Sequence, residues 1–261
     1  MTLMISLNKL NVADKKELDR FRDLTFEDFG RMAKDDSLQP HEKIGFPSVF
    51  REGFDSEIFE EIKNKIDWQS AKKIADIGCG CGELTNLILR ATLSDNKSLV
   101  LVDSAQVLSQ LQEQNNVQKV PGRFPDNFDH VKMHGTFDVV ICYSVFHYIF
   151  NEVNVFRFIE NCMELLSPGG RFLLGDIPNL SKRNRFLLTP AGERFHQKLM
   201  NTTAKPEVHP HTVETGKIDD GIIFGLLSRY RNMGIETYLL PQSATLPLAN
   251  SREDILFVKP R

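Results

Sequence analysis

The 261-residue chain predicts an α/β fold built on a doubly wound, mostly parallel sheet. Between residues 72 and 176, short apolar runs alternate with stretches of helical period, which is the pattern of consecutive βαβ units. Within this region, residues 72–89 (KKIADIGCGCGELTNLIL) join an apolar strand to a helix through three glycines at alternate positions. Such a turn lets the backbone approach a ligand closely at the start of the helix.

The spacing of the glycines separates two classes of ligand. Dinucleotide-binding folds use G-x-G-x-x-G, which here would need a glycine in place of Glu83, and a glutamate would repel a pyrophosphate. Residues 76–82 instead read D-x-G-x-G-x-G. This pattern resembles the first motif of the class I S-adenosylmethionine-dependent methyltransferases, whose cofactor carries a cationic sulfonium and an amino-acid tail.

Three further landmarks follow in the order of that family. Residues 98–103 (SLVLVD) form a second apolar run that ends in a carboxylate, residues 136–143 (TFDVVICY) resemble the family's fourth strand, and residues 166–176 (LSPGGRFLLGD) resemble the turn into its fifth. The resemblance covers residues 72–176. It implies S-adenosyl-L-methionine as cofactor and a Rossmann-like seven-stranded sheet whose last strand is antiparallel.

The resemblance also implies which residues bind the cofactor. Asp103 ends the second strand, where a carboxylate can accept hydrogen bonds from both ribose hydroxyls. After the third strand the family often shows Gly-Asp, whereas this chain has Gly122 and Arg123, and Arg123 cannot accept a hydrogen bond. Adenine recognition is left to Phe124 stacking, to Asp126 or to backbone groups. The expected cofactor residues are Asp76, Gly78, Cys79, Gly80, Gly82, Asp103, Ser104, Phe124, Tyr143 and Ser144.

Two histidines are candidates for the catalytic base. His147 follows the fourth strand, where the family often places acceptor contacts, and histidine titrates near neutrality. A structural role for His147 stays open, and His41 is the alternative. Histidines 196, 209 and 211 match no familiar zinc spacing, so no metal is expected. The basic cluster at residues 182–185 allows either a phosphate contact or a solvated loop.

Two segments outside the region of resemblance are predicted to cover the site, one before it and one after it. Residues 1–70 are expected to form a helical lid, with helices at 14–24, at 26–34 capped by Thr25, and from residue 55. The domain proper is residues 71–261, with helices at 105–114, 152–166 and 219–233 and strands at 117–120, 235–240 and 254–259. Residues 178–217 exceed a simple connection and predict a cap insertion before the sixth strand, over the carboxyl ends of the strands.

The composition of the chain argues against nucleic acid and membranes as binding partners. The net charge of −3 provides no basic field for nucleic acid or anionic lipid. The start of the chain has no secretory leader pattern and no apolar run of membrane-spanning length, so a cytoplasmic protein with four reduced cysteines is expected. A homodimer is left open.

The predicted function is methyl transfer from S-adenosylmethionine to an oxygen or nitrogen of a small polar metabolite. The N-terminal segment is similar to segments that precede methyltransferase domains in bacterial surface-glycan clusters, which points to a sugar or nucleotide-sugar acceptor. The alternatives are a non-catalytic cofactor-binding or partner subunit, an RNA-modifying methyltransferase and a nicotinamide oxidoreductase.

Overall fold

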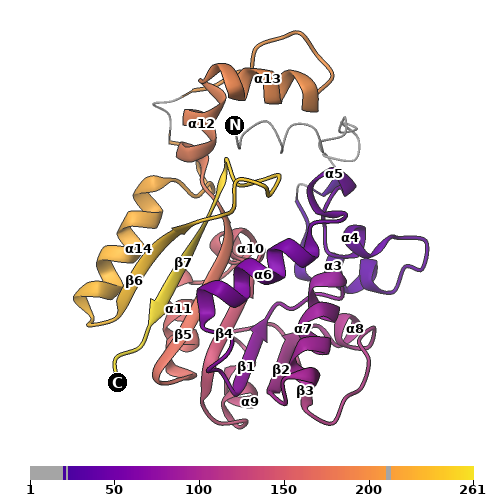
Figure 1. The fold of residues 1–261 in the computed structure, drawn as a ribbon, viewed down its shortest axis with the longest axis vertical. Coiled ribbons are helices and arrows are strands. Elements are labelled where there is room, and N and C mark those ends of the chain that lie inside the picture. The colour runs from indigo at the N-terminus through magenta and orange to yellow at the C-terminus, as the bar shows by residue number, and fades with distance from the viewer. Residues whose placement is uncertain (1–19, 22, 210–212) are drawn as a thin grey trace.

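Seven strands form a single sheet in the computed structural model, which describes residues 20–21, 23–209 and 213–261 (Figure 1). Their order is β3-β2-β1-β4-β5-β7-β6. Strands β1 to β5 pair in parallel, and β7 pairs antiparallel with both β5 and β6. This topology confirms the predicted seven-stranded sheet with its antiparallel last strand. The strands are β1 (Lys73–Ile77), β2 (Ser98–Asp103), β3 (Val117–Pro121), β4 (Phe137–Tyr143), β5 (Leu166–Pro178), β6 (Glu236–Pro241) and β7 (Arg252–Val258).

Helices cover both faces of the sheet and divide the core into two layers. In β1, Ile74 belongs to one hydrophobic cluster while Ala75 and Ile77 belong to the other, because alternate strand residues point to opposite faces. The first cluster contains α6 (Asp55–Ile66), α7 (Glu83–Ser94) and α8 (Ala105–Leu108). The second contains α9 (Phe128–Lys132), α10 (Phe146–Glu152), α11 (Val155–Glu164) and α14 (Asp220–Asn232).

Two predicted helices differ from those observed. The helix expected over 105–114 ends at Leu108, where the Ser109 hydroxyl donates to the Gln106 carbonyl and competes with the helical pattern. The helix expected over 152–166 begins at Val155, after a separate helix α10. The sequence predicts a buried face formed by Phe156, Ile159, Met163 and Leu166. This prediction is wrong at Phe156, which is 45% exposed and lies in the first turn of α11 against Arg229 of α14.

The N-terminal segment crosses the carboxyl end of the sheet. It comprises α3 (Phe26–Ala33), α4 (Pro40–Lys43) and α5 (Ser48–Arg51), and Figure 1 shows it beyond the tips of the strands near α8. Thr25 caps α3 in a capping box with Asp28, as predicted. The expected helix at 14–24 lies almost wholly outside the described residues. Helix α6 buries Ile58, Ile62 and their neighbours, so it belongs to the core layer.

Residues 178–217 contain two helices that project from the sheet at the top of Figure 1, α12 (Leu180–Leu187) and α13 (Pro190–Leu199). Thr189 caps α13 and Pro190 is its first residue, as predicted. This insertion meets the N-terminal segment in a small apolar cluster formed by Val49, Phe50, Phe195 and Leu199. Within the described ranges, no helix combines the length and apolarity that crossing a bilayer requires.

Candidate active site

The glycine turn after β1 adopts a conformation that only glycine holds without strain. Gly78 has a φ of +72° and Gly80 a φ of +65°, both in the left-handed region, while Gly82 caps α7. Close neighbours add a second constraint. A Cβ at Gly78 would lie 2.8 Å from Val145, and a Cβ at Gly80 or Gly82 would lie 2.9 Å from the Ile44 side chain. Ile44 belongs to the N-terminal segment, so that segment packs directly on the turn.

The tip of β2 is tied to the glycine turn through Asp103. Its Oδ2 accepts a hydrogen bond from the backbone N–H of Gly80 at 2.9 Å, and its Oδ1 accepts one from Ser104 at 2.7 Å. Burial raises the pKa of Asp103 to about 6, against the lowering effect of these two donors. The carboxylate therefore stays ionised at neutral pH, with oxygens available to a further donor.

Asp76 lies behind the turn at the end of β1. It is 4% exposed and accepts no hydrogen bond from the described residues. Burial, together with the nearby charge of Asp103, raises the pKa of Asp76 to about 7. A buried carboxylate without a partner is an unfavourable arrangement that a nearby cation relieves.

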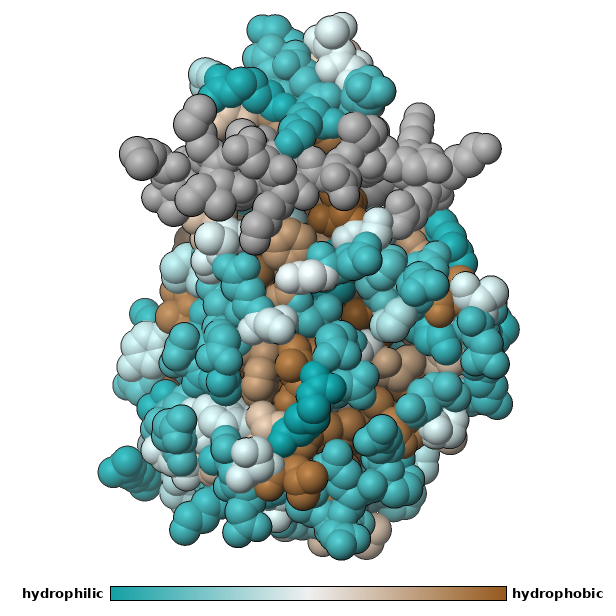
Figure 2. All heavy atoms as spheres, turned by 45° about the vertical axis from the view of Figure 1, so that its right-hand side comes forward, coloured by the Kyte–Doolittle hydropathy of each residue, from teal (hydrophilic) through white to brown (hydrophobic). Residues whose placement is uncertain are grey.

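A cavity lies between the glycine turn and the N-terminal segment. Its volume is about 140 Å³, and part of it is open to solvent. The glycine turn and the tips of β2 and β4 form one wall. The opposite wall comes from the N-terminal segment and consists of Phe26, Phe29, Lys43, Ile44, Phe46 and Arg51. Figure 2, in which this side of the molecule comes forward, shows apolar patches within an otherwise polar surface.

The structure brings most of the expected cofactor residues together on the cavity wall. These are Gly78, Cys79, Gly80, Gly82, Asp103, Phe124, Tyr143 and Ser144. Asp76 and Ser104 lie outside the wall, and Ser104 caps α8. Phe124 packs edge-on against Phe158, with ring centroids 5.3 Å apart. Arg123 forms an ion pair with Glu152 across the same part of the wall, whereas Asp126 is exposed and outside it.

Neither candidate histidine is part of the cavity wall. His41 lies on α4. His147 lies on α10 with its Nδ1 buried and without a hydrogen-bond partner. Burial, followed by the charges of Arg252 and Lys217, lowers the pKa of His147 well below its ordinary value, so its imidazole is neutral at physiological pH.

A second polar pair stands closer to the cavity than the histidines. Ser144, at the end of β4, has a φ of +63°, and Asp176, near the end of β5, has a φ of +58°. The Ser144 hydroxyl, on the cavity wall, donates to Asp176 Oδ2 at 2.7 Å. Non-glycine residues in the left-handed region are strained and gather at functional sites. The sequence predicted Ser144 as a cofactor residue. No pattern in the sequence predicted its hydrogen bond to Asp176.

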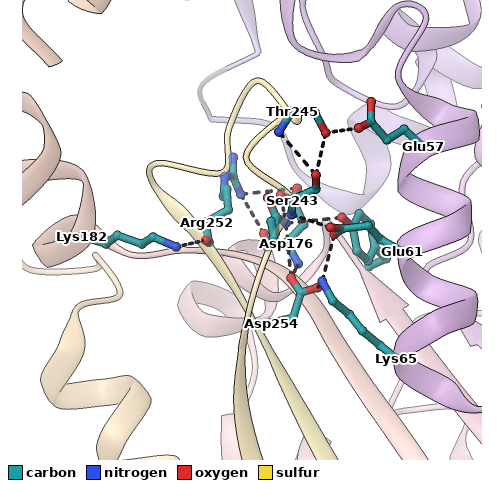
Figure 3. A network of polar contacts seen from close by, with 11 residues as sticks. Glu57, Glu61, Lys65, Asp176, Lys182, Ser243, Thr245, Arg252 and Asp254 are labelled. Carbon is teal, nitrogen blue, oxygen red and sulfur yellow. Dashed lines mark hydrogen bonds and ion pairs between the residues drawn. The ribbon is translucent and has the colours of Figure 1, made fainter. Parts of the chain in front are cut away.

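A buried polar network fixes Asp176 from behind (Figure 3). Gln242 Nε2 donates to Asp176 Oδ1 at 3.1 Å, and Arg252 lies 3.7 Å from its Oδ2. The fully buried Asp254 accepts hydrogen bonds from the Asp176 backbone N–H and from Lys65 Nζ, both at 2.8 Å. These bonds join α6, β5 and β7, and therefore hold the tip of β5 in one geometry.

The basic cluster of the insertion is engaged within the protein. Lys182 donates to the Arg252 carbonyl at 2.8 Å and lies 3.7 Å from Glu253. Arg185 forms an ion pair with Asp220. Two of the three cations thus have carboxylate partners, which lends no support to a phosphate contact at this cluster.

Replacing Gly80 with alanine is expected to weaken cofactor binding by at least about 10-fold, because the new methyl group would meet Ile44 where the backbone must approach the ligand. Gly53→Ala is the matched control. Gly53 has a similar φ of +80° but open space around its Cβ position, so it bears the same backbone strain of about 1 kcal/mol without the contact. Calorimetry with S-adenosylhomocysteine on both variants separates the two effects, and equal affinities would contradict the assignment.

A family comparison agrees with the fold and the site. Residues 75–172 match the family described as "Methyltransferase domain", and the matched region contains the glycine turn and the tips of β2 and β4. The observed strand order is the one predicted for the class I methyltransferase fold, and the matched region agrees with the family, activity and cofactor predicted from the sequence.

Individual solved structures share the fold. The plantazolicin methyltransferase BpumL, in complex with a monoazolic desmethylPZN analog and SAH, has a TM-score of 0.56 and 13% identity over 94% of this chain and 100% of its own. The N-methyltransferase NodS from Bradyrhizobium japonicum WM9, in complex with S-adenosyl-L-homocysteine, has a TM-score of 0.53 and 13% identity over 92% of this chain and 100% of its own. The methyltransferase domain of bacterial CtHen1 has a TM-score of 0.52 and 14% identity over 79% and 100%. No curated protein sequence matches the chain.

Proposed function

We propose that the protein transfers a methyl group from S-adenosylmethionine to an oxygen or nitrogen atom of a small polar metabolite. The observation that carries this proposal is the cavity itself. It has a glycine turn and the Asp103 carboxylate on one wall and a covering segment on the other. A nucleoside with an amino-acid tail suits this chemistry, with its ribose at Asp103 and its tail along the glycines.

The acceptor is proposed to reach the cavity beside Ser144, which follows β4, and Tyr148 of α10, both of which line the wall. Methyl transfer from a sulfonium is an in-line displacement, so alignment of acceptor and cofactor inside the cavity supplies much of the acceleration. A small acceptor agrees with a site enclosed by α3 to α5. A sugar remains the narrower proposal. The ion pairs of Lys182 and Arg185 favour an acceptor without a phosphate at that position.

The experiment combines ligand stabilisation with turnover. S-adenosylmethionine and S-adenosylhomocysteine are expected to raise the melting temperature, whereas nicotinamide dinucleotides are not. Formation of S-adenosylhomocysteine with a pool of small metabolites would then identify an enzyme. Binding without turnover in any pool would support a non-catalytic subunit instead, and turnover with RNA alone would support an RNA-modifying enzyme.

Asp176→Asn is expected to lower the turnover rate by about 10²–10⁴-fold, because the pair formed by Ser144 and Asp176 can take a proton from the acceptor at the cavity wall. His147→Gln is expected to leave the pH dependence of the rate unchanged, since that imidazole is already neutral. The measurement is the pH–rate profile of each variant with the acceptor pool. A profile that loses its acid limb in His147→Gln but keeps it in Asp176→Asn would assign the base to His147.

A further inference from the structure

Arg51 is a buried cation on the N-terminal segment. Its side chain is 4% exposed, and it lies on the cavity wall at the end of α5. Its Nε donates to Asp55 Oδ1 at 2.7 Å, and its guanidinium lies 5.2 Å from the ring centre of Phe46. One edge of the guanidinium is therefore satisfied by the protein.

The other edge of this guanidinium has no partner among the residues that the structure describes. Neither terminal nitrogen of Arg51 donates a hydrogen bond to any described residue. The remaining cations of the cavity wall differ in this respect. Lys43 donates to the Ala33 carbonyl at 3.1 Å, and Arg123 is paired with Glu152. Leaving charged donors buried and unpaired is unfavourable, so a ligand that accepts from them would be stabilised.

We infer that the free edge of Arg51 binds a carboxylate inside the cavity, an inference that rests on the proposed function and extends it. The planar guanidinium matches the two oxygens of a carboxylate, and pairing of this kind is stronger than a neutral hydrogen bond. Asp55 holds the guanidinium in a fixed orientation, which removes part of the entropic cost of binding. Two carboxylates are chemically suitable: the one on the amino-acid tail of the cofactor, and an acid group on the acceptor.

Because Arg51 lies on the N-terminal segment, a carboxylate bound to it would also help to keep the site closed. Arg51 ends α5, and the same short helix contributes Val49 to the apolar cluster with Phe195 and Leu199 of the insertion. A carboxylate bound to Arg51 would hold α5 against the cavity. Binding of the ligand would therefore stabilise the position of both coverings at once.

Calorimetry with two related ligands tests the inference. S-adenosylhomocysteine carries the amino-acid tail, whereas 5′-methylthioadenosine has the same nucleoside and thioether without it. If the carboxylate is the cofactor's, Arg51→Gln is expected to weaken S-adenosylhomocysteine binding about 10–100-fold and leave 5′-methylthioadenosine binding unchanged. Arg51→Lys keeps the charge but not the paired donors, so an intermediate loss is expected.

A second arm tests the acceptor as the source. Acetate is titrated into protein saturated with S-adenosylhomocysteine, with the melting temperature as readout. Acetate that stabilises the wild type but not Arg51→Gln, with unchanged S-adenosylhomocysteine affinity, would assign the site to an acid on the acceptor. Two unchanged measurements in Arg51→Gln would together overturn the inference. These are the ratio of the affinities for S-adenosylhomocysteine and 5′-methylthioadenosine, and the change in melting temperature that acetate causes.

Two further variants serve as controls for folding and for the loss of a positive charge. Arg51→Gln leaves Asp55 without its partner, so the double variant Arg51→Gln with Asp55→Asn restores a neutral pair and preserves folding. Arg31→Gln changes an arginine whose side chain is 72% exposed on α3 and is expected to change no affinity. Failure of the wild type to bind either nucleoside would overturn the proposed function itself, a result distinct from an unaltered Arg51→Gln.

Discussion

Asp103→Ala is expected to reduce the affinity for S-adenosylhomocysteine by at least about 100-fold. The substitution removes the carboxylate that would accept two ribose hydroxyls, and each hydrogen bond to a charged group contributes about 1.5–3 kcal/mol. It also releases the backbone N–H of Gly80, which Asp103 holds at 2.9 Å, so the glycine turn loses its tie to β2. Isothermal titration at pH 7.5 measures the change.

Two further variants, Asp103→Asn and Asp126→Asn, test whether the loss of affinity is specific to the Asp103 carboxylate. Asparagine keeps one acceptor oxygen for Gly80 but loses the charge and one acceptor, so a smaller loss than that of alanine is expected. Asp126 is exposed and outside the cavity wall, although the sequence left it as an adenine contact. Its substitution is expected to have no effect. Unchanged affinity in Asp103→Ala would remove the ribose assignment, and a large loss in Asp126→Asn would restore the adenine contact.

Asp76→Asn is expected to act in opposite directions on stability and on cofactor binding. Burial raises the pKa of Asp76 from 3.8 to about 7. A raised carboxyl pKa means that the folded state prefers the protonated form, so this contribution to stability is complete below about pH 4 and is lost as pH rises through 7. Each pKa unit corresponds to about 1.4 kcal/mol, so ionisation destabilises the unliganded protein by a few kcal/mol at pH 8.

The amide of Asp76→Asn keeps the neutral state at every pH. The melting temperature of the unliganded variant is therefore expected to exceed that of the wild type at pH 8 by several degrees, at about 2–4 °C per kcal/mol, and to equal it near pH 4. The cofactor carries an ammonium and a sulfonium, which the Asp76 carboxylate attracts. Its affinity for the variant is expected to fall about 10-fold, and wild-type affinity is expected to rise between pH 6 and 8.

Thermal unfolding at the two pH values and titration with S-adenosylmethionine measure both effects. Asp129→Asn, which changes an exposed carboxylate on α9, serves as the control for charge removal. A variant that is less stable than the wild type at pH 8 would show that the Asp76 carboxylate has a partner that stabilises it. Equal affinities for the cofactor would remove Asp76 from the cofactor site.

The sheet could be predicted from the sequence because its signals are local. Apolar runs between residues 72 and 176, each ended by a glycine, a carboxylate or a turn, identify β1 to β5 in their order along the chain. Capping residues such as Thr25 and Thr189 fix helix starts through bonds to residues three positions away. Predictions were wrong where a helix end depends on distant packing, as at Phe156, whose exposure is set by its position beside α14.

The sequence by itself determined the fold, the glycine turn and the carboxylate at the tip of β2, since these follow from spacing along one continuous stretch. Only the tertiary structure decided which side chains share the cavity. It joined Ser144 to Asp176, 32 positions apart, and placed Ile44 and Arg51 over the glycines from a segment that precedes the sheet. It also set His147 outside the cavity wall. These contacts join segments that are far apart in the sequence. The periodicity and spacing of residues in a single sequence do not show which distant segments pack together.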